Sequence, residues 1–255
     1  MATAIISLGS NLGDRQATLN SAIDKLRTTV SIEKVLTSSY HATQPVGGSP
    51  AQNEFLNAAV RLDTSLSPHE LLSELQRIEL ELGRQRQEHW GPRTLDLDLL
   101  LYDDLVVHDS QLVVPHRFLP FRRFVLEPAC EVASDLRHPL LGWTIGQLLA
   151  HARSAANVFK VVSPTKSITE AFCQRLSQAH LSLTTLPIAS ENNESVCYLL
   201  PGAITGQSDP KAVFYLVNGD QTQALQQMDV PTLLLPARDL DCAVREAVAA
   251  MQAMQ

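Results

Sequence analysis

The chain has 255 residues with a formal net charge of −7, and 18% of its residues are charged. This negative balance argues against general nucleic-acid binding, and no apolar run approaches the ~20 residues that a membrane-spanning helix needs. The first residues contain neither a basic segment nor an apolar signal segment, so we expect a cytoplasmic protein without a membrane partner.

The hydrophobic pattern predicts alternating strands and helices in the first part of the chain. In chain order they are a strand over 3–8, a helix around 19–26, strands over 30–40 and 55–62, a helix over 67–83, a strand from 95, and a closing helix around 145–149. The order strand, helix, strand, strand, helix, strand is typical of a ferredoxin-like fold. We therefore expect one α/β (α+β) domain over residues 1–160, built as a sandwich of helices on an antiparallel sheet.

The helix over 67–83 has the clearest boundaries. Ser67 is expected as its N-cap, Pro68 occupies the first helical position, and Glu70 completes a capping box. A run of leucines and isoleucines then continues to Gly83, where the helix is expected to stop.

The strand from 95 carries the most informative pattern, because two aspartates alternate with leucines. Side chains at i and i+2 share one face of a strand, so Asp96 and Asp98 project together while the leucines face a core. Adjacent carboxylates repel each other unless a cation lies between them, and a hard divalent ion such as Mg²⁺ suits this arrangement. A solvated edge strand with outward acids is the alternative that spacing alone leaves open.

The sequence around the two aspartates is rich in arginine. The flanking arginines are Arg84, Arg86, Arg93, Arg117, Arg122 and Arg123. Carboxylates that bind metal and are surrounded by arginines indicate a site for a polyphosphate.

Residues 161–255 are expected to form a second, small α/β domain. Strands are predicted near 158–162, 181–188, 196–200, 212–217 and 232–235, with helices over 168–179, 222–228 and 240–254. The segment from Val161 to Ser167 has the order strand, loop, Lys-Ser and helix, but it lacks the glycines with which a phosphate-binding loop wraps its ligand. A packing or homodimerisation role is therefore favoured over nucleotide binding.

Several motifs in the first 160 residues occur in a recognisable order. They are Gly9-Ser10-Asn11-Leu12-Gly13, Phe55-Leu56-Asn57, Gly83-Arg84, Trp90 to Asp98, and Val114-Pro115-His116 through Arg122-Arg123-Phe124. With these motifs the chain resembles the 6-hydroxymethyl-7,8-dihydropterin pyrophosphokinases of folate biosynthesis. The resemblance implies a ferredoxin-like fold and transfer of pyrophosphate from ATP, as co-substrate, to the pterin hydroxymethyl group, leaving AMP.

The resemblance also implies roles for the charged residues. Asp96 and Asp98 would hold two Mg²⁺ ions, and Asp96 would help to accept the hydroxyl proton. Arg86 and Arg93 would clamp the transferred phosphates. The residues implied in nucleotide binding are Gln76, Glu79, Arg84, Leu99, His116 and Arg122. Two alternatives stay open: Arg84 pairing with Glu81 at the helix end, and Gln76 and Glu79 as polar bystanders on the helix surface.

For the flat, polar pterin the resemblance implies a sandwich between Phe55 and Phe124, which suits aromatic stacking. Asn57, Thr43 and the Val46 backbone would bind the pterin edge. Trp90 would belong to a loop that closes over the substrates and excludes water.

Two positions depart from the family pattern. Gln111 stands where some members carry an arginine near the nucleotide, and Arg117 follows His116 where an aromatic residue or proline is more usual. Whether Arg117 replaces the missing charge is left open by the sequence.

Three functions are compatible with parts of this pattern. An active pyrophosphokinase explains the carboxylates, the arginines and the aromatic pair together. A non-catalytic pterin or nucleotide sensor, regulated by the C-terminal extension, would not need the metal carboxylates. A Mg²⁺-dependent phosphohydrolase leaves the aromatic pair unexplained. The sequence favours the active enzyme, with small-molecule substrates as its partners.

Overall fold

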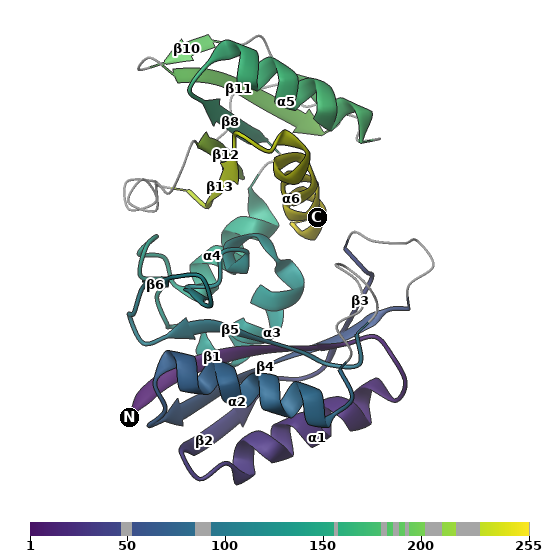
Figure 1. The fold of residues 1–255 in the computed structure, drawn as a ribbon, viewed down its shortest axis with the longest axis vertical. Coiled ribbons are helices and arrows are strands. Elements are labelled where there is room, and N and C mark those ends of the chain that lie inside the picture. Colours follow the sequence, from purple (N-terminus) through teal and green to yellow (C-terminus); the bar gives the residue numbers. More distant parts are fainter. Residues whose placement is uncertain are drawn as a thin grey trace. The chain divides into compact units, whose positions relative to one another are not determined.

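The structure is a computed structural model, shown in Figure 1. It describes residues 1–46, 53–84, 93–155, 158–179, 183–185, 189–191, 194–201, 211–217 and 230–254. The chain divides into two compact units, Met1–Leu149 and Ala150–Gln255, each with its own sheet.

The sheet of the first unit is antiparallel throughout. Its main strands have the order β2-β4-β1-β5, with the short β3 paired to β4. The strands are β1 (Ala2–Ser10), β2 (Ile32–Thr37), β3 (His41–Thr43), β4 (Phe55–Thr64) and β5 (Asp96–Tyr102). This order, with one helix after β1 and one after β4, is the predicted ferredoxin-like topology.

Helices cover both faces of this sheet. Helix α1 (Arg15–Thr28) and helix α2 (Pro68–Glu81) lie side by side on one face (Figure 1), where their buried side chains pack on alternate residues of β1 and β4. Helix α3 (Arg123–Ala133) packs against β4 and β1 on the other face. The first unit is therefore the αβα sandwich that the sequence predicted.

The ends of α2 follow its sequence signals. Ser67 and Glu70 form the predicted capping box. At the other end Gly83 adopts φ +85°, a conformation that glycine tolerates best, so Gly83 N–H donates to Leu80 O and Arg84 N–H to Glu79 O. This closure turns the chain so that Arg84 leaves the helix beside Glu79.

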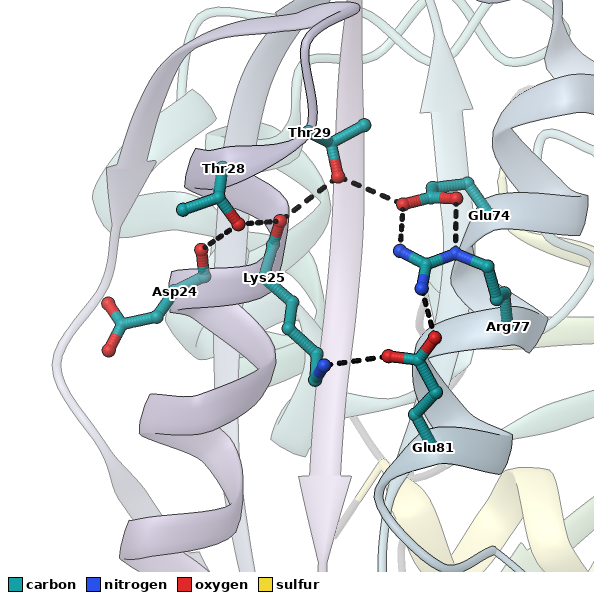
Figure 2. A network of polar contacts seen from close by, with 7 residues as sticks. All are labelled: Asp24, Lys25, Thr28, Thr29, Glu74, Arg77 and Glu81. Carbon is teal, nitrogen blue, oxygen red and sulfur yellow. Dashed lines mark hydrogen bonds and ion pairs between the residues drawn. The ribbon is translucent and has the colours of Figure 1, made fainter.

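A network of polar contacts joins α1 to α2 along their outer sides (Figure 2). Lys25 Nζ lies 2.7 Å from Glu81 Oε2, and Thr29 Oγ1 donates to Glu74 Oε1 at 2.9 Å. Arg77 binds both glutamates from within α2. Each contact is partly exposed and contributes little alone, but together they form one network between the two helices.

Two parts of the first unit differ from the prediction. The strand expected over 30–40 is shorter, since β2 covers Ile32–Thr37, and it is irregular because Lys34 has a positive φ of 48° and the pairing with β4 shifts between Glu33 and Leu36. Helix α3 was not predicted, because Pro128 lies inside it and argues locally against a helix. The remaining elements are the hairpin β6 (Val107–His108) and β7 (Val113–Val114), a 3₁₀ turn η1 (Leu119–Phe121) and α4 (Ile145–Ser154).

The second unit has a mixed sheet with the order β10-β11-β8-β12-β13, and β9 pairs with β11. Its strands are β8 (Phe159–Ser163), β9 (Leu183–Thr185), β10 (Ala189–Glu191), β11 (Glu194–Pro201), β12 (Ala212–Val217) and β13 (Thr232–Pro236). Strand β12 is parallel to β8 and β13, whereas β11 is antiparallel to β8. Helix α5 (Lys166–Gln178) packs against α6 (Leu240–Ala253), and Arg175 Nε lies 3.0 Å from Asp241 Oδ1 between them.

The helix predicted over 222–228 lies outside the described residues. Among the helices that the structure describes, none is both long and apolar enough to cross a membrane.

Candidate active site

A cavity of about 420 Å³ opens in the first unit where β1 ends and β4 and β5 begin. The antiparallel register sets Gly9 of β1 opposite Asn57 of β4 on one side and opposite Asp96 of β5 on the other. A Cβ atom at Gly9 would lie 3.2 Å from Asn57 Oδ1, so this approach of the strands favours glycine. The sheet thus brings an amide and a carboxylate to the two sides of one opening.

Most of the residues predicted for the site line this cavity. They are Thr43, Val46, Phe55, Asn57, Arg93, Asp96, Asp98, Leu99, His116, Arg122 and Phe124. Arg86 and Trp90 lie outside the described residues.

One side of the cavity is charged. Arg93 Nη1 lies 2.7 Å and Arg84 Nη2 3.0 Å from the same atom, Asp96 Oδ1. Asp98 Oδ2 has more distant neighbours, with Arg122 Nη1 at 3.8 Å and His116 Nε2 at 3.9 Å. The intervening Leu95, Leu97 and Leu99 are buried, as the alternating pattern predicted.

The electrostatics of this side differ from those of an ordinary surface. Burial raises the pKa of Asp96, and the charge of Asp98 raises it further against the opposing effect of the arginines. Burial and the nearby Arg122 lower the pKa of His116 to about 3, so its imidazole is neutral at physiological pH. Burial also lowers the pKa of Arg122. Two carboxylates that repel each other are thus held together, and an added cation would relieve that repulsion.

Two carboxylates do not enclose a metal ion by themselves. Within the described ranges, no group of three or more His, Cys, Asp and Glu side chains is arranged to hold one. Mg²⁺ is commonly bound by one or two carboxylates that share it with water and substrate phosphates. The donor set of Asp96 and Asp98 fits an ion that arrives with a nucleotide.

Another side of the cavity, here called the neutral side, is lined by uncharged side chains and adjoins the charged side where Arg122 Cζ lies 5.8 Å from the Phe124 ring centre. Strand β3 pairs with β4 so that Thr43 lies opposite Phe55. Asn57 Nδ2 donates to Thr43 Oγ1 at 2.8 Å. Phe55 and Phe124 both line the cavity, Phe124 from the first turn of α3. This side offers aromatic surface together with amide and hydroxyl groups.

Glu79 does not line the cavity but supports it from behind. The residue is 2% exposed, and Glu79 Oε1 accepts a 2.7 Å hydrogen bond from the N–H of Leu97, which lies between the two aspartates in the sequence. Arg84 pairs with Glu79 and with Asp96 rather than with Glu81, which pairs with Lys25 and Arg77. Burial raises the pKa of Glu79 to about 6 against the effects of Leu97 N–H and Arg84. Gln76, one turn earlier on α2, is also not among the lining residues.

Asn11 holds the backbone of Arg93. Its side-chain Oδ1 accepts from Arg93 N–H at 2.7 Å, and its own N–H donates to Arg93 O at 3.1 Å. Asn11 is 1% exposed, and its Nδ2 has no hydrogen-bond partner among the described residues. The Gly-Ser-Asn motif therefore acts on the site through the main chain of an arginine.

The structure adds residues that the sequence analysis did not select. Phe118 lines the cavity and lies under two guanidinium groups, with Arg122 Cζ 4.8 Å and Arg117 Cζ 4.9 Å from its ring centre. Gln44 and Leu72 also contribute, and the two departures from the family pattern, Gln111 and Arg117, both line the cavity. The sequence signal that could have identified Phe118 is its aromatic side chain two positions after His116, within a motif already assigned to the site.

Comparison with known proteins identifies the family. The family model described as 7,8-dihydro-6-hydroxymethylpterin-pyrophosphokinase matches residues 5–134. The chain belongs to this family. The match confirms the resemblance inferred from the motifs and supports an active transferase over a sensor.

Curated relatives agree with this assignment. The 2-amino-4-hydroxy-6-hydroxymethyldihydropteridine pyrophosphokinase of Methylorubrum extorquens is 45% identical over 150 residues, which cover 59% of this chain and 93% of the relative. The proteins of the same name from Haemophilus influenzae and Bacillus subtilis are 43% and 45% identical, over 54% and 52% of this chain and 86% and 79% of their own lengths. As a member of this pyrophosphokinase family, the chain is an enzyme of folate biosynthesis.

Proposed function

We propose that the cavity of the first unit transfers the pyrophosphoryl group of ATP to the hydroxymethyl group of 6-hydroxymethyl-7,8-dihydropterin. The pterin hydroxyl oxygen forms a bond to the β-phosphorus, the bond from that phosphorus to the α,β-bridging oxygen breaks, and AMP leaves with the bridging oxygen. The observation that carries the proposal is the meeting of a neutral aromatic and amide side with a carboxylate and arginine side in one cavity.

The neutral side is assigned to the pterin. Phe55 and Phe124 would stack on its ring faces. Asn57, already ordered by its hydrogen bond to Thr43, would use its free carbonyl lone pairs and amide hydrogen on the polar edge of the ring, next to the Val46 backbone.

The charged side is assigned to the triphosphate. Arg93 and Arg122 would bind phosphate oxygens as planar donors, and neutral His116 would donate one hydrogen bond. We assign Arg84, Arg86, Gln76 and Leu99 to the same nucleotide-binding region, with Glu79 supporting it. Asp96, whose pKa is raised, is assigned to accept the hydroxyl proton.

We further propose that Asp96 and Asp98 hold two Mg²⁺ ions delivered with ATP. The ions would supply neutralisation of the charge that develops on the phosphate oxygens. The repulsion between the two carboxylates supports this assignment, because a bound cation removes it.

Closure and domain roles complete the proposal. Trp90 is assigned to a segment that closes over the substrates and excludes water, which would otherwise accept the pyrophosphoryl group. Residues 1–160 are proposed as the catalytic domain and residues 161–255 as an appendage for packing or homodimerisation, in a cytoplasmic enzyme. Truncation after residue 160 tests both assignments, with activity and molecular mass in solution as the measurements. Lost activity overturns the first assignment. If the molecular masses give the same number of chains per particle before and after truncation, dimerisation through residues 161–255 is overturned.

The direct test is to incubate the purified protein with the dihydropterin, ATP and Mg²⁺ and to identify the nucleotide product. AMP that forms only with pterin, and is lost in an Asp96→Ala/Asp98→Ala double variant, is the expected result. ADP would indicate phosphoryl transfer or hydrolysis. Tight binding of both ligands without turnover would instead support the sensor.

A further inference from the structure

A cluster of three polar side chains lies outside the cavity, between α3 and the segment that enters β3. Glu131 of α3 accepts hydrogen bonds from Ser39 N–H at 2.7 Å and from Ser39 Oγ at 2.7 Å. His41 Nε2 lies 2.6 Å from Glu131 Oε1 and 3.2 Å from Ser39 Oγ. One carboxylate therefore binds the backbone and both side chains of this segment.

The cluster contains a serine, a histidine and an acid, but it is not arranged for nucleophilic catalysis. In a hydrolytic triad the acid binds the ring nitrogen opposite the one that faces the serine. Here Glu131 and Ser39 both approach Nε2 of His41, and the serine hydroxyl donates to the carboxylate. The histidine is thus not placed to take the proton of Ser39, and the cluster must act through geometry.

Its position connects the cluster to the neutral side of the cavity from two directions. His41 and Thr43 are at i and i+2 in β3, so both side chains point to one face of the strand. Phe124 and Glu131 are seven residues apart in α3, which sets them on one face of the helix about two turns apart. Glu131 and His41 thus join, at one end, the two elements that carry Phe124 and Thr43.

The segment is also fixed on its other side. Ser38 N–H donates to Ala59 O, and Ala59 N–H donates to Ser38 Oγ, both at 2.9 Å. Strand β4 therefore holds this segment from the sheet side while Glu131 holds it from the helix side. Burial raises the pKa of Glu131, but the hydrogen bonds from Ser39 and His41 outweigh that effect and keep the pKa below its usual value, so the carboxylate is ionised.

We propose that Ser39, His41 and Glu131 form a clamp that fixes α3 relative to β3, and with it the position of Phe124, at the pterin ring face, relative to Thr43, at the pterin edge. The three are positioning residues, because they act through Phe124 and Thr43 and do not line the cavity. The inference rests on the proposed assignment of the neutral side to the pterin. It implies that the clamp tunes pterin binding and leaves nucleotide binding unaffected.

The test compares Glu131→Ala with Asp135→Ala. Asp135 follows α3 and makes a more exposed contact to β4, with its Oδ1 3.6 Å from Arg61 Nη1, so this variant also removes an acid that links this region to the sheet. Glu131→Gln, which keeps one acceptor oxygen for Ser39, serves if the alanine variant does not fold.

We expect Glu131→Ala to raise the KM for the pterin about tenfold and to leave the KM for ATP within about twofold. Asp135→Ala should change neither, and Glu131→Gln should give an intermediate pterin KM. An unchanged pterin KM in Glu131→Ala, or equal rises for both substrates, would overturn the inference.

The same variants also separate this inference from the proposed function. If the wild-type protein binds the pterin without turnover, the proposed reaction fails, and dissociation constants for pterin and ATP replace the KM values in the same comparison. If the wild-type protein binds no pterin, both the assignment of the neutral side and the clamp are overturned.

Discussion

The neutral and charged sides of the cavity differ in how their polar groups are satisfied within the protein. On the neutral side the polar groups satisfy one another before any ligand arrives, as Asn57 and Thr43 do. On the charged side Asp96 and Asp98 are held together despite their repulsion, and Arg122 Nη1 lies 3.8 Å from Asp98 Oδ2. The difference teaches that the side proposed for the pterin is already hydrogen-bonded within itself, whereas the side proposed for the phosphates leaves a repulsion that a bound cation would relieve.

The largest expected effect comes from removing the negative charge of Asp98, one of the two carboxylates proposed to bind Mg²⁺. We expect Asp98→Asn to lower kcat by at least about 10³-fold, because one of the two proposed Mg²⁺ ligands is lost. Asp104→Ala, in the exposed turn after β5, is the control and should retain full activity. Activity of Asp98→Asn within tenfold of wild type, measured as AMP formation, would contradict the dependence of this side on metal.

The next largest effect on kcat is expected when the Arg93 backbone loses its hydrogen bond to the Asn11 side chain. Asn11→Ala removes the acceptor for Arg93 N–H and should lower kcat about 10- to 100-fold while the pterin KM changes little. Ser10→Ala is the matched control, since Ser10 is equally buried and its hydroxyl has no partner among the described residues. In an Arg93→Ala background the Asn11 substitution should add almost nothing, and full additivity would contradict action through Arg93.

A smaller expected effect is the pH dependence that Glu79 gives to the free energy of unfolding. The pKa of Glu79 is raised to about 6, so the folded state binds a proton that the unfolded state releases near pH 4.5. This carboxyl therefore makes the free energy of unfolding fall by about 2 kcal/mol as the pH rises from 4.5 through 6. The Glu79→Gln variant has no carboxyl at this position, so its free energy of unfolding should not show this fall.

The measurement is urea unfolding of the Glu79→Gln variant and the wild type between pH 4.5 and 7. We expect the difference between their unfolding free energies to move in favour of the variant as the pH rises. A difference that is independent of pH would show that Glu79 titrates normally.

The smallest predicted effect compares an aromatic residue from each side. Phe124→Leu should raise the KM for the pterin about fivefold through lost stacking. Phe118→Leu, which removes the ring under Arg117 and Arg122, should instead act on the KM for ATP. If both variants change the same KM, the division of the cavity into two sides is wrong.

Local patterns predicted those parts of the fold in which neighbours along the chain decide the structure. The alternation around Asp96 and Asp98 predicted β5, and the capping box and Gly83 predicted both ends of α2. Helix α3 was missed because Pro128 opposes a helix locally while packing against β4 supports it. That contact joins segments far apart in the sequence, so no local pattern reveals it.

The same limit applies to the site. The motifs identified many of the side chains that line the cavity, but not Phe118, Gln44 or Leu72. They also did not show that the Glu79 carboxylate binds Leu97 N–H or that Asn11 binds the backbone of Arg93. The polar Glu131 cluster was also not predicted, because Ser39 and Glu131 are 92 positions apart. Residue types can show which groups a reaction needs, but the supporting contacts depend on the tertiary fold.

The hydrogen bond that Glu79 accepts from Leu97 N–H also has a consequence for the edge of the sheet. Strand β5 is the last strand of its sheet, and an open strand edge invites pairing with another polypeptide. The Glu79 carboxyl occupies Leu97 N–H on that edge, and His116 N–H occupies Leu100 O at 2.9 Å. Both contacts occupy backbone groups that an added strand would need, so this part of the β5 edge is protected against intermolecular strand pairing.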